Sequence, residues 1–167
     1  MEAIISQLEK SFNETTQLLS QFSQEEINTI PFKDSWTAAQ VGCHLLKSGT
    51  GTDNILTEST HPVDRAPDEN AENLKKLFLN FENKMQAPDF IIPEDKIYNK
   101  EELIFSLKEL TKKTIEAARK SNLSQTTSLP DIHPLKGMSK LEMIHFLTYH
   151  TMRHNNQIKN IKTSLNV

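Results

Sequence analysis

Four long stretches of this sequence carry apolar residues at spacings of three and four, and this feature restricts the fold more than any other. Such spacing places the side chains on one face of an α-helix. The four apolar stripes begin at Ile4, Val41, Leu103 and Ile144. No run of alternating β-branched residues and no internal repeat competes with them. The pattern therefore predicts an all-α protein.

Side chains that cap helix N-termini precede three of the four stripes. Each signal is a pair of residues three apart, and the side chain of the first accepts a hydrogen bond from the backbone N–H of the second. In a capping box, the side chain of the second residue also accepts from the backbone N–H of the first. We therefore expect a helix starting near Ala38 and a last helix of about 25 residues. Gly49 and Gly51 each weaken the second helix by about 1 kcal/mol relative to alanine, so it ends either near Ser48 or at Leu56. The capping pairs are Thr37 with Gln40, Asn99 with Glu102, and Ser139 with Glu142.

A shorter amphipathic segment, residues 72–85, lies between the second and third long stripes. Its apolar residues run from Leu74 to Met85 at helical spacing, and Pro88 and Pro93 follow. Helices with one apolar face bury that face against one another. We therefore predict a four-helix bundle with a short accessory helix between helices two and three, forming a single domain over residues 1–167.

Charge and composition exclude several classes of function. The formal net charge is −3 and no segment is strongly basic, so we expect no nucleic-acid partner. No stretch approaches eighteen consecutive apolar residues, and the N-terminus lacks a basic, apolar leader, so we expect no membrane partner. The single cysteine, Cys43, cannot form an intramolecular disulfide. These features predict a soluble, cytoplasmic protein.

Three histidines fall on the inward faces of two predicted helices. His150 and His154 are one turn apart, about 6 Å along the axis, beside the last apolar stripe. His44 lies on the inner face of the second helix. Two imidazoles at this spacing can chelate one divalent ion, and burying three without a common partner would leave ring nitrogens unpaired. We therefore predict a metal site formed by His44, His150 and His154.

Other polar residues fit ordinary structural roles. His145 is rotated off the face of His150, and Cys43 projects about 100° away from His44, as a small buried hydrophobe would. Gln157, one turn after His154, could orient a ligand, bond a neighbouring helix or touch substrate. None of these residues is assigned a catalytic role, so the general base stays unassigned. The same holds for His61 and His133 in predicted loops, for Glu142 in its cap, and for Asp34 and Asp53.

Two segments resemble the DinB-like superfamily, which includes the YfiT-type putative metal-dependent hydrolases. The segment "SWTAAQVGCHLLKS" resembles the tryptophan, cap and histidine that open the second helix of that family. The segment "HPLKGMSKLEMIHFLTYHTMRHNNQI" resembles its last helix, with a glycine-containing loop, a glutamate, two histidines and a glutamine. In this sequence the corresponding positions are Gly137, Glu142, His150, His154 and Gln157.

The resemblance implies several expectations. The fold would be a bundle in up-down-down-up order, and His44, His150 and His154 would bind a divalent metal, usually nickel or zinc. Members with an assigned role are mostly thiol transferases that use bacillithiol, mycothiol or glutathione, and others carry a hydrolase label. A low-molecular-weight thiol and a small-molecule substrate are thus expected, as is a homodimer.

Two functional hypotheses remain from the sequence. Three neutral histidines leave coordination positions open, as in catalytic zinc sites, and a divalent ion there would activate a bound water or thiol. The first hypothesis is therefore a metal-dependent thiol-S-transferase or hydrolase acting on a small molecule. The second is a non-catalytic, metal-binding or stress-related bundle that serves as a binding module. Histidine alone does not distinguish zinc, nickel, copper and iron.

Overall fold

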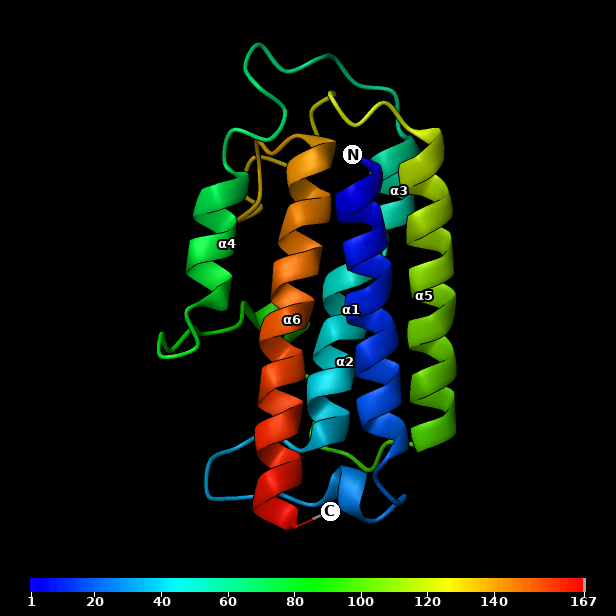
Figure 1. The fold of residues 1–167 in the computed structure, drawn as a ribbon, viewed down its shortest axis with the longest axis vertical. Helices are drawn as coiled ribbons and strands as arrows, with labels where there is room; N and C mark the ends of the chain where they lie inside the picture. The colour runs from blue at the N-terminus through cyan, green and yellow to red at the C-terminus, as the bar shows by residue number, and fades with distance from the viewer. Residues whose placement is uncertain (167) are drawn as a thin grey trace.

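The computed structural model describes residues 1–166 and is helical, as the apolar spacing predicts. Four long helices lie side by side along the molecule, and the short α4 packs against the outside of α6 (Figure 1). Among the helices of the described residues, none combines the length and apolar character that a membrane crossing requires. The elements are α1 (Glu2–Ser20), the 3-10 turn η1 (Glu26–Asn28), α2 (Ala38–Gly49), α3 (Thr52–Thr57), α4 (Ala71–Leu79), the 3-10 turn η2 (Asp89–Ile91), α5 (Lys100–Lys120) and α6 (Lys140–Leu165).

Helices α1 and α6 run in the same direction. Gln7 near the start of α1 contacts Met152 in the middle of α6, and Gln21, just after α1, contacts Lys162 near the end of α6. Helix α5 runs opposite to α1, as the ion pair between Arg119 at the end of α5 and Glu2 at the start of α1 shows. Figure 1 shows α2 and α5 both running upward in the view, so α1 and α6 share one direction while α2 and α5 share the other.

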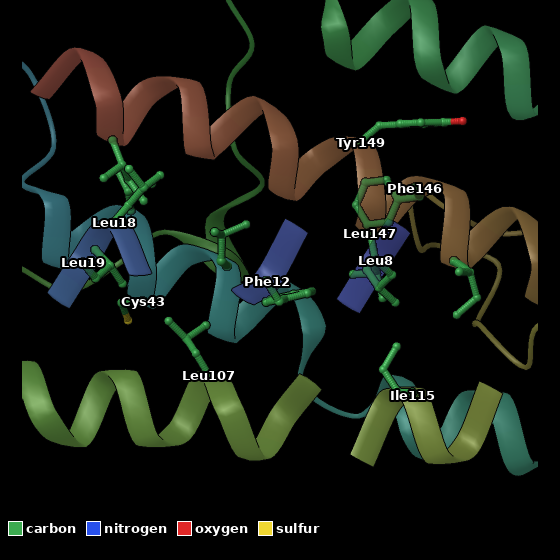
Figure 2. Close-up of a cluster of buried hydrophobic side chains, with 14 of the residues drawn as sticks. Leu8, Phe12, Leu18, Leu19, Cys43, Leu107, Ile115, Phe146, Leu147 and Tyr149 are labelled. Atoms are coloured by element: carbon green, nitrogen blue, oxygen red, sulfur yellow. The ribbon is translucent and has the colours of Figure 1, made fainter. Parts of the chain in front are cut away.

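The core lies between α1, α2, α5 and α6. Figure 2 shows Leu8, Leu107 and Leu147, from α1, α5 and α6, directed into the space between the helices. Leu8 and Leu107 are fully buried, and Leu147 nearly so. Burial of each such side chain stabilises the fold by about 1.5–3 kcal/mol. Cys43 lies in the same apolar cluster, as expected for a small buried hydrophobe.

The capping signals locate the helix starts correctly. Thr37 and Gln40 form a complete capping box, so α2 starts at Ala38. Ser139 and Glu142 form a second one at the start of α6, which is 26 residues long. The side chain of Asn99 accepts a hydrogen bond from the backbone N–H of Glu102 at the start of α5.

Of the two ends predicted for the second helix, the earlier one near Ser48 is correct, whereas the end predicted for the accessory helix is not. Helix α2 ends at Gly49, and Gly51 adopts a φ of 83°, which separates α2 from the short α3. The prediction that the accessory helix extends through residues 72–85 is wrong at its end, because α4 stops at Leu79. Phe81 and Met85 continue the helical spacing but are exposed in the following loop, so no packing surface supports another turn there.

Candidate metal centre

The structure brings together the three histidines that the sequence groups as a site. His44 projects from α2, and His150 and His154 project from successive turns of α6. The Nε2 atom of His150 lies 3.1 Å from Nε2 of His44 and 3.1 Å from Nε2 of His154. The candidate ligand atoms of the three rings all lie within 4.8 Å of one another. The three imidazoles therefore point their Nε2 atoms toward one common point.

The outer ring nitrogens of two of these histidines are held by oxygen acceptors. Nδ1 of His44 lies 3.0 Å from the backbone carbonyl oxygen of Ile91. Nδ1 of His154 lies 2.8 Å from Oε1 of Gln157. Since these oxygens only accept hydrogen bonds, each Nδ1 carries the hydrogen and donates it. In the neutral rings of His44 and His154, Nε2 is then left with a lone pair that faces the common point.

His150 lies between these two lone pairs. A hydrogen on its Nε2 can be donated to one neighbour only, which leaves the other lone pair without a donor. A hydrogen on its Nδ1 instead turns all three lone pairs toward one another. That Nδ1 atom is buried and has no hydrogen-bond partner within residues 1–166. No neutral arrangement satisfies all three rings, whereas a cation at the common point would attract every lone pair.

Aromatic side chains enclose the histidines. The Phe146 ring stacks on His150 with centroids 5.2 Å apart, and Phe78 of α4 meets the same ring edge-on at 5.6 Å. Trp36, just before α2, packs against His44 at 5.1 Å. These contacts restrict rotation of two of the rings and exclude water from their outer faces.

Burial keeps the three imidazoles neutral. It lowers the pKa of His150 well below the ordinary 6.5, and the neighbouring His154 and His44 lower it further. Burial, followed by the proximity of His44, lowers the pKa of His154 to about 3. Burial also lowers the pKa of His44, although the hydrogen bond to Ile91 opposes this shift. Because all three pKa values are lowered, the imidazoles are neutral at pH 7. Neutral imidazole is the form that coordinates a metal.

Access to the cluster is restricted. His44 and His150 are 3% and 6% exposed, and His154 is half-buried, so solvent reaches the cluster on the His154 side. Two hollows of about 250 Å³ each lie elsewhere on the surface. One lies between α1 and α5, and the other lies beside the loop containing His61 and Arg65. Neither is lined by any of the three clustered histidines.

The Glu142 carboxylate is occupied by structural contacts. It accepts two hydrogen bonds of 2.6 Å from Arg65. It also accepts from the backbone N–H groups of Ser139 and Asn70. Burial alone would raise its pKa, but these donors outweigh that effect and lower it. Glu142 is therefore an ionised anchor between the 65–70 loop and α6, which agrees with the capping role that the sequence predicts.

The remaining candidates lie outside the cluster. His145 contacts the Tyr149 hydroxyl at 3.2 Å, and His133 packs near Phe90 in a loop. Within residues 1–166, no carboxylate or thiol joins the group of candidate ligand atoms, which places Asp34 and Asp53 outside it. Among the described residues, no carboxylate oxygen therefore joins the cluster as a candidate general base.

Sequence reasoning missed two partners of the site. The acceptor for His44 is a backbone carbonyl, that of Ile91, and no side-chain pattern identifies which carbonyl a distant histidine will meet. Arg65 lies 77 residues before Glu142 in a predicted loop, so only the fold reveals that pair. Gln157 could be found from its spacing, and of its three expected roles the structure shows the hydrogen bond that orients His154.

Comparisons with known proteins locate the chain in one family. A family model described as the DinB superfamily matches residues 7–158, a span that contains all three clustered histidines. No curated protein and no solved structure matches the chain.

Proposed function

Because the chain belongs to the DinB superfamily, we propose that it binds one divalent metal ion, nickel or zinc, through Nε2 of His44, His150 and His154. We further propose that it is a metal-dependent enzyme, a thiol-S-transferase or a hydrolase acting on a small molecule. The observation that carries the proposal is the convergence of three Nε2 atoms, two of which have lone pairs fixed toward the common point.

The spacing of the donor atoms suits a metal ion. Zn–N bonds of about 2.0–2.1 Å place neighbouring ligand nitrogens roughly 3–3.4 Å apart. The two Nε2 separations of 3.1 Å lie in that range. The hydrogen bonds from His44 and His154 to oxygen acceptors also match the outer contacts that orient metal-bound histidines.

The chain supplies three neutral ligands and no ligand carboxylate within the described residues. A divalent ion with such ligands keeps its double positive charge and lowers the pKa of a coordinated water or thiol toward neutrality. The half-buried edge of His154 provides the side from which a small molecule would approach. The aromatic rings of Trp36, Phe78 and Phe146 keep water from the other sides. These features support the enzyme hypothesis.

One observation favours the second hypothesis, a non-catalytic binding module. His44 and His150 are almost fully buried, whereas an enzyme of this kind would receive its substrate in a cleft beside the metal. In that case the ion would contribute folding stability by binding only the native state.

Metal content of the untagged protein tests the proposal. Mass spectrometry of the wild type is expected to find about one equivalent of nickel or zinc. His150→Ala and His154→Ala are expected to lose it while the helical circular-dichroism signal persists. His145→Ala is the matched control, because it removes an imidazole from the same helix outside the cluster.

The function is then tested with the loaded protein. Consumption of a low-molecular-weight thiol in the presence of a small electrophile, lost in His150→Ala, supports thiol transfer. Release of product from ester or amide substrates without thiol supports hydrolysis. Metal binding with neither activity favours the binding module. No metal in the wild type, even after reconstitution, would contradict the proposed site.

A further inference from the structure

A short segment of the chain, residues 89–94, crosses α2 beside the histidine cluster. Three α2 side chains on one face hold its backbone. Nδ1 of His44 donates to the Ile91 carbonyl at 3.0 Å, Nζ of Lys47 donates to the Ile92 carbonyl at 2.8 Å, and Nε2 of Gln40 reaches the Glu94 carbonyl at 3.5 Å. The segment that orients His44 is thus itself attached to the helix that carries His44.

Lys47 makes the strongest of these attachments. Besides the Ile92 carbonyl, its ammonium contacts the Glu94 carboxylate at 2.6 Å. Glu94 is fixed from a second side, because the Tyr98 hydroxyl donates to its carbonyl at 2.9 Å and reaches its carboxylate at 3.2 Å. Lys47 therefore holds residues 92 and 94, and the carbonyl of Ile91 lies immediately before them.

We propose that Lys47 is a positioning residue for the metal ligand His44: it fixes the 89–94 segment so that the Ile91 carbonyl accepts from Nδ1 and Nε2 stays available. This inference rests on the proposed function, because it treats His44 as a ligand. Loss of the outer contact of a metal-bound histidine weakens binding about 10- to 100-fold. Removing Lys47 should have an effect of this kind without touching any ligand.

The sign of the effect separates positioning from simple electrostatics. A lysine one turn from His44 repels a bound cation, so charge removal alone would tighten metal binding. Loss of positioning would weaken it. Lys96 provides the matched control, because its ammonium lies 3.8 Å from the other oxygen of the same Glu94 carboxylate. Replacing it removes one positive charge near that carboxylate and leaves the Lys47 contact with Ile92 in place.

The test measures the Zn²⁺ affinity of metal-free wild type, Lys47→Met, Lys47→Arg and Lys96→Met by competition with a chromogenic chelator. We expect Lys47→Met to raise Kd about 10- to 100-fold, Lys47→Arg to stay near wild type, and Lys96→Met to leave Kd unchanged or lower it. The urea midpoint of the metal-free Lys47→Met protein should stay near wild type, because exposed ion pairs contribute little to stability. An unchanged or lower Kd in Lys47→Met would overturn the positioning role.

A second readout does not depend on the metal. Ring ¹⁵N chemical shifts of His44 in metal-free protein should show the Nδ1–H form in wild type and Lys96→Met, and a mixture of both forms in Lys47→Met. If wild type binds no Zn²⁺, the proposed function fails while this readout still tests the role of Lys47. An unmixed Nδ1–H form in Lys47→Met would overturn the inference on its own.

Discussion

Gln157 accepts a hydrogen bond from Nδ1 of His154 at 2.8 Å, one helical turn after the histidine. This bond fixes the hydrogen on Nδ1 and turns the Nε2 lone pair toward His150. The two residues lie on the same helix, so their relationship depends only on α6 being formed. His44 obtains the same orientation from the Ile91 carbonyl, which a separate segment must bring into place.

Replacement of Gln157 by leucine should therefore weaken metal binding without removing a ligand. Leucine has a similar size but accepts no hydrogen bond, so His154 would divide between its two neutral forms. We expect the Kd for Zn²⁺ to rise about 10- to 100-fold, measured by chelator competition. Asn160→Leu, an exposed position on the same helix, is the control and should bind as wild type does. Equal affinities for Gln157→Leu and wild type would contradict the orienting role.

The long helices and the histidine cluster could be predicted from the sequence because both follow from local spacing. The capping pairs and the interval between His150 and His154 act within one or two helical turns. The inward face of His44 also follows from its own helix. What could not be predicted depends on contacts between distant segments, such as the Arg65 pair with Glu142 and the Ile91 carbonyl beside His44.

The end of the accessory helix illustrates the same limit. Phe81 keeps the helical spacing of the preceding residues, yet α4 ends at Leu79. Arg153 of α6 donates hydrogen bonds to the carbonyl oxygens of Phe78 and Asn80, so these carbonyl groups at the end of α4 are satisfied by a neighbouring helix. Periodicity alone does not contain this tertiary contact.

Arg65→Ala should be among the more destabilising substitutions outside the apolar core. It would leave the Glu142 carboxylate, which is 0% exposed, without its charged partner. Removing one partner of a buried ion pair costs about 3–5 kcal/mol, and the 25% exposure of Arg65 should place this case near the lower value, about 3 kcal/mol. Urea unfolding measures the change. Arg119→Ala, which removes an exposed pair with Glu2, should cost less than about 1 kcal/mol. Similar losses in the two variants would contradict the anchoring role of Glu142.

Gly51→Ala should destabilise the protein by about 1 kcal/mol for a reason confined to the backbone. Gly51 has a φ of 83°, and an added Cβ would meet no atom within 4 Å, so no clash contributes. The left-handed conformation costs a residue with a side chain about 1–2 kcal/mol. Alanine also reduces the conformational entropy of the unfolded chain, and this stabilising effect partly offsets the cost. Gly51→Asn should cost less, because asparagine tolerates the left-handed region. Urea unfolding of both variants tests this, and an alanine variant as stable as wild type would contradict it.

The metal-free protein should lose stability as the pH falls from about 6.5 toward 5. Burial lowers the pKa of His44, His150 and His154, so in this range the unfolded chain binds protons that the folded protein does not. The free energy of unfolding therefore decreases as the pH is lowered, by at most about 1.4 kcal/mol per pH unit for each histidine. The lowered pKa values of Glu94 and Glu142 affect stability only below about pH 4.5, so they do not act between pH 6.5 and 5.

Urea unfolding at several pH values, in the presence of a chelator, measures how the free energy of unfolding changes with pH. His150→Gln should reduce this change. A slope that is the same in wild type and His150→Gln would show that His150 is already protonated in the folded, metal-free protein.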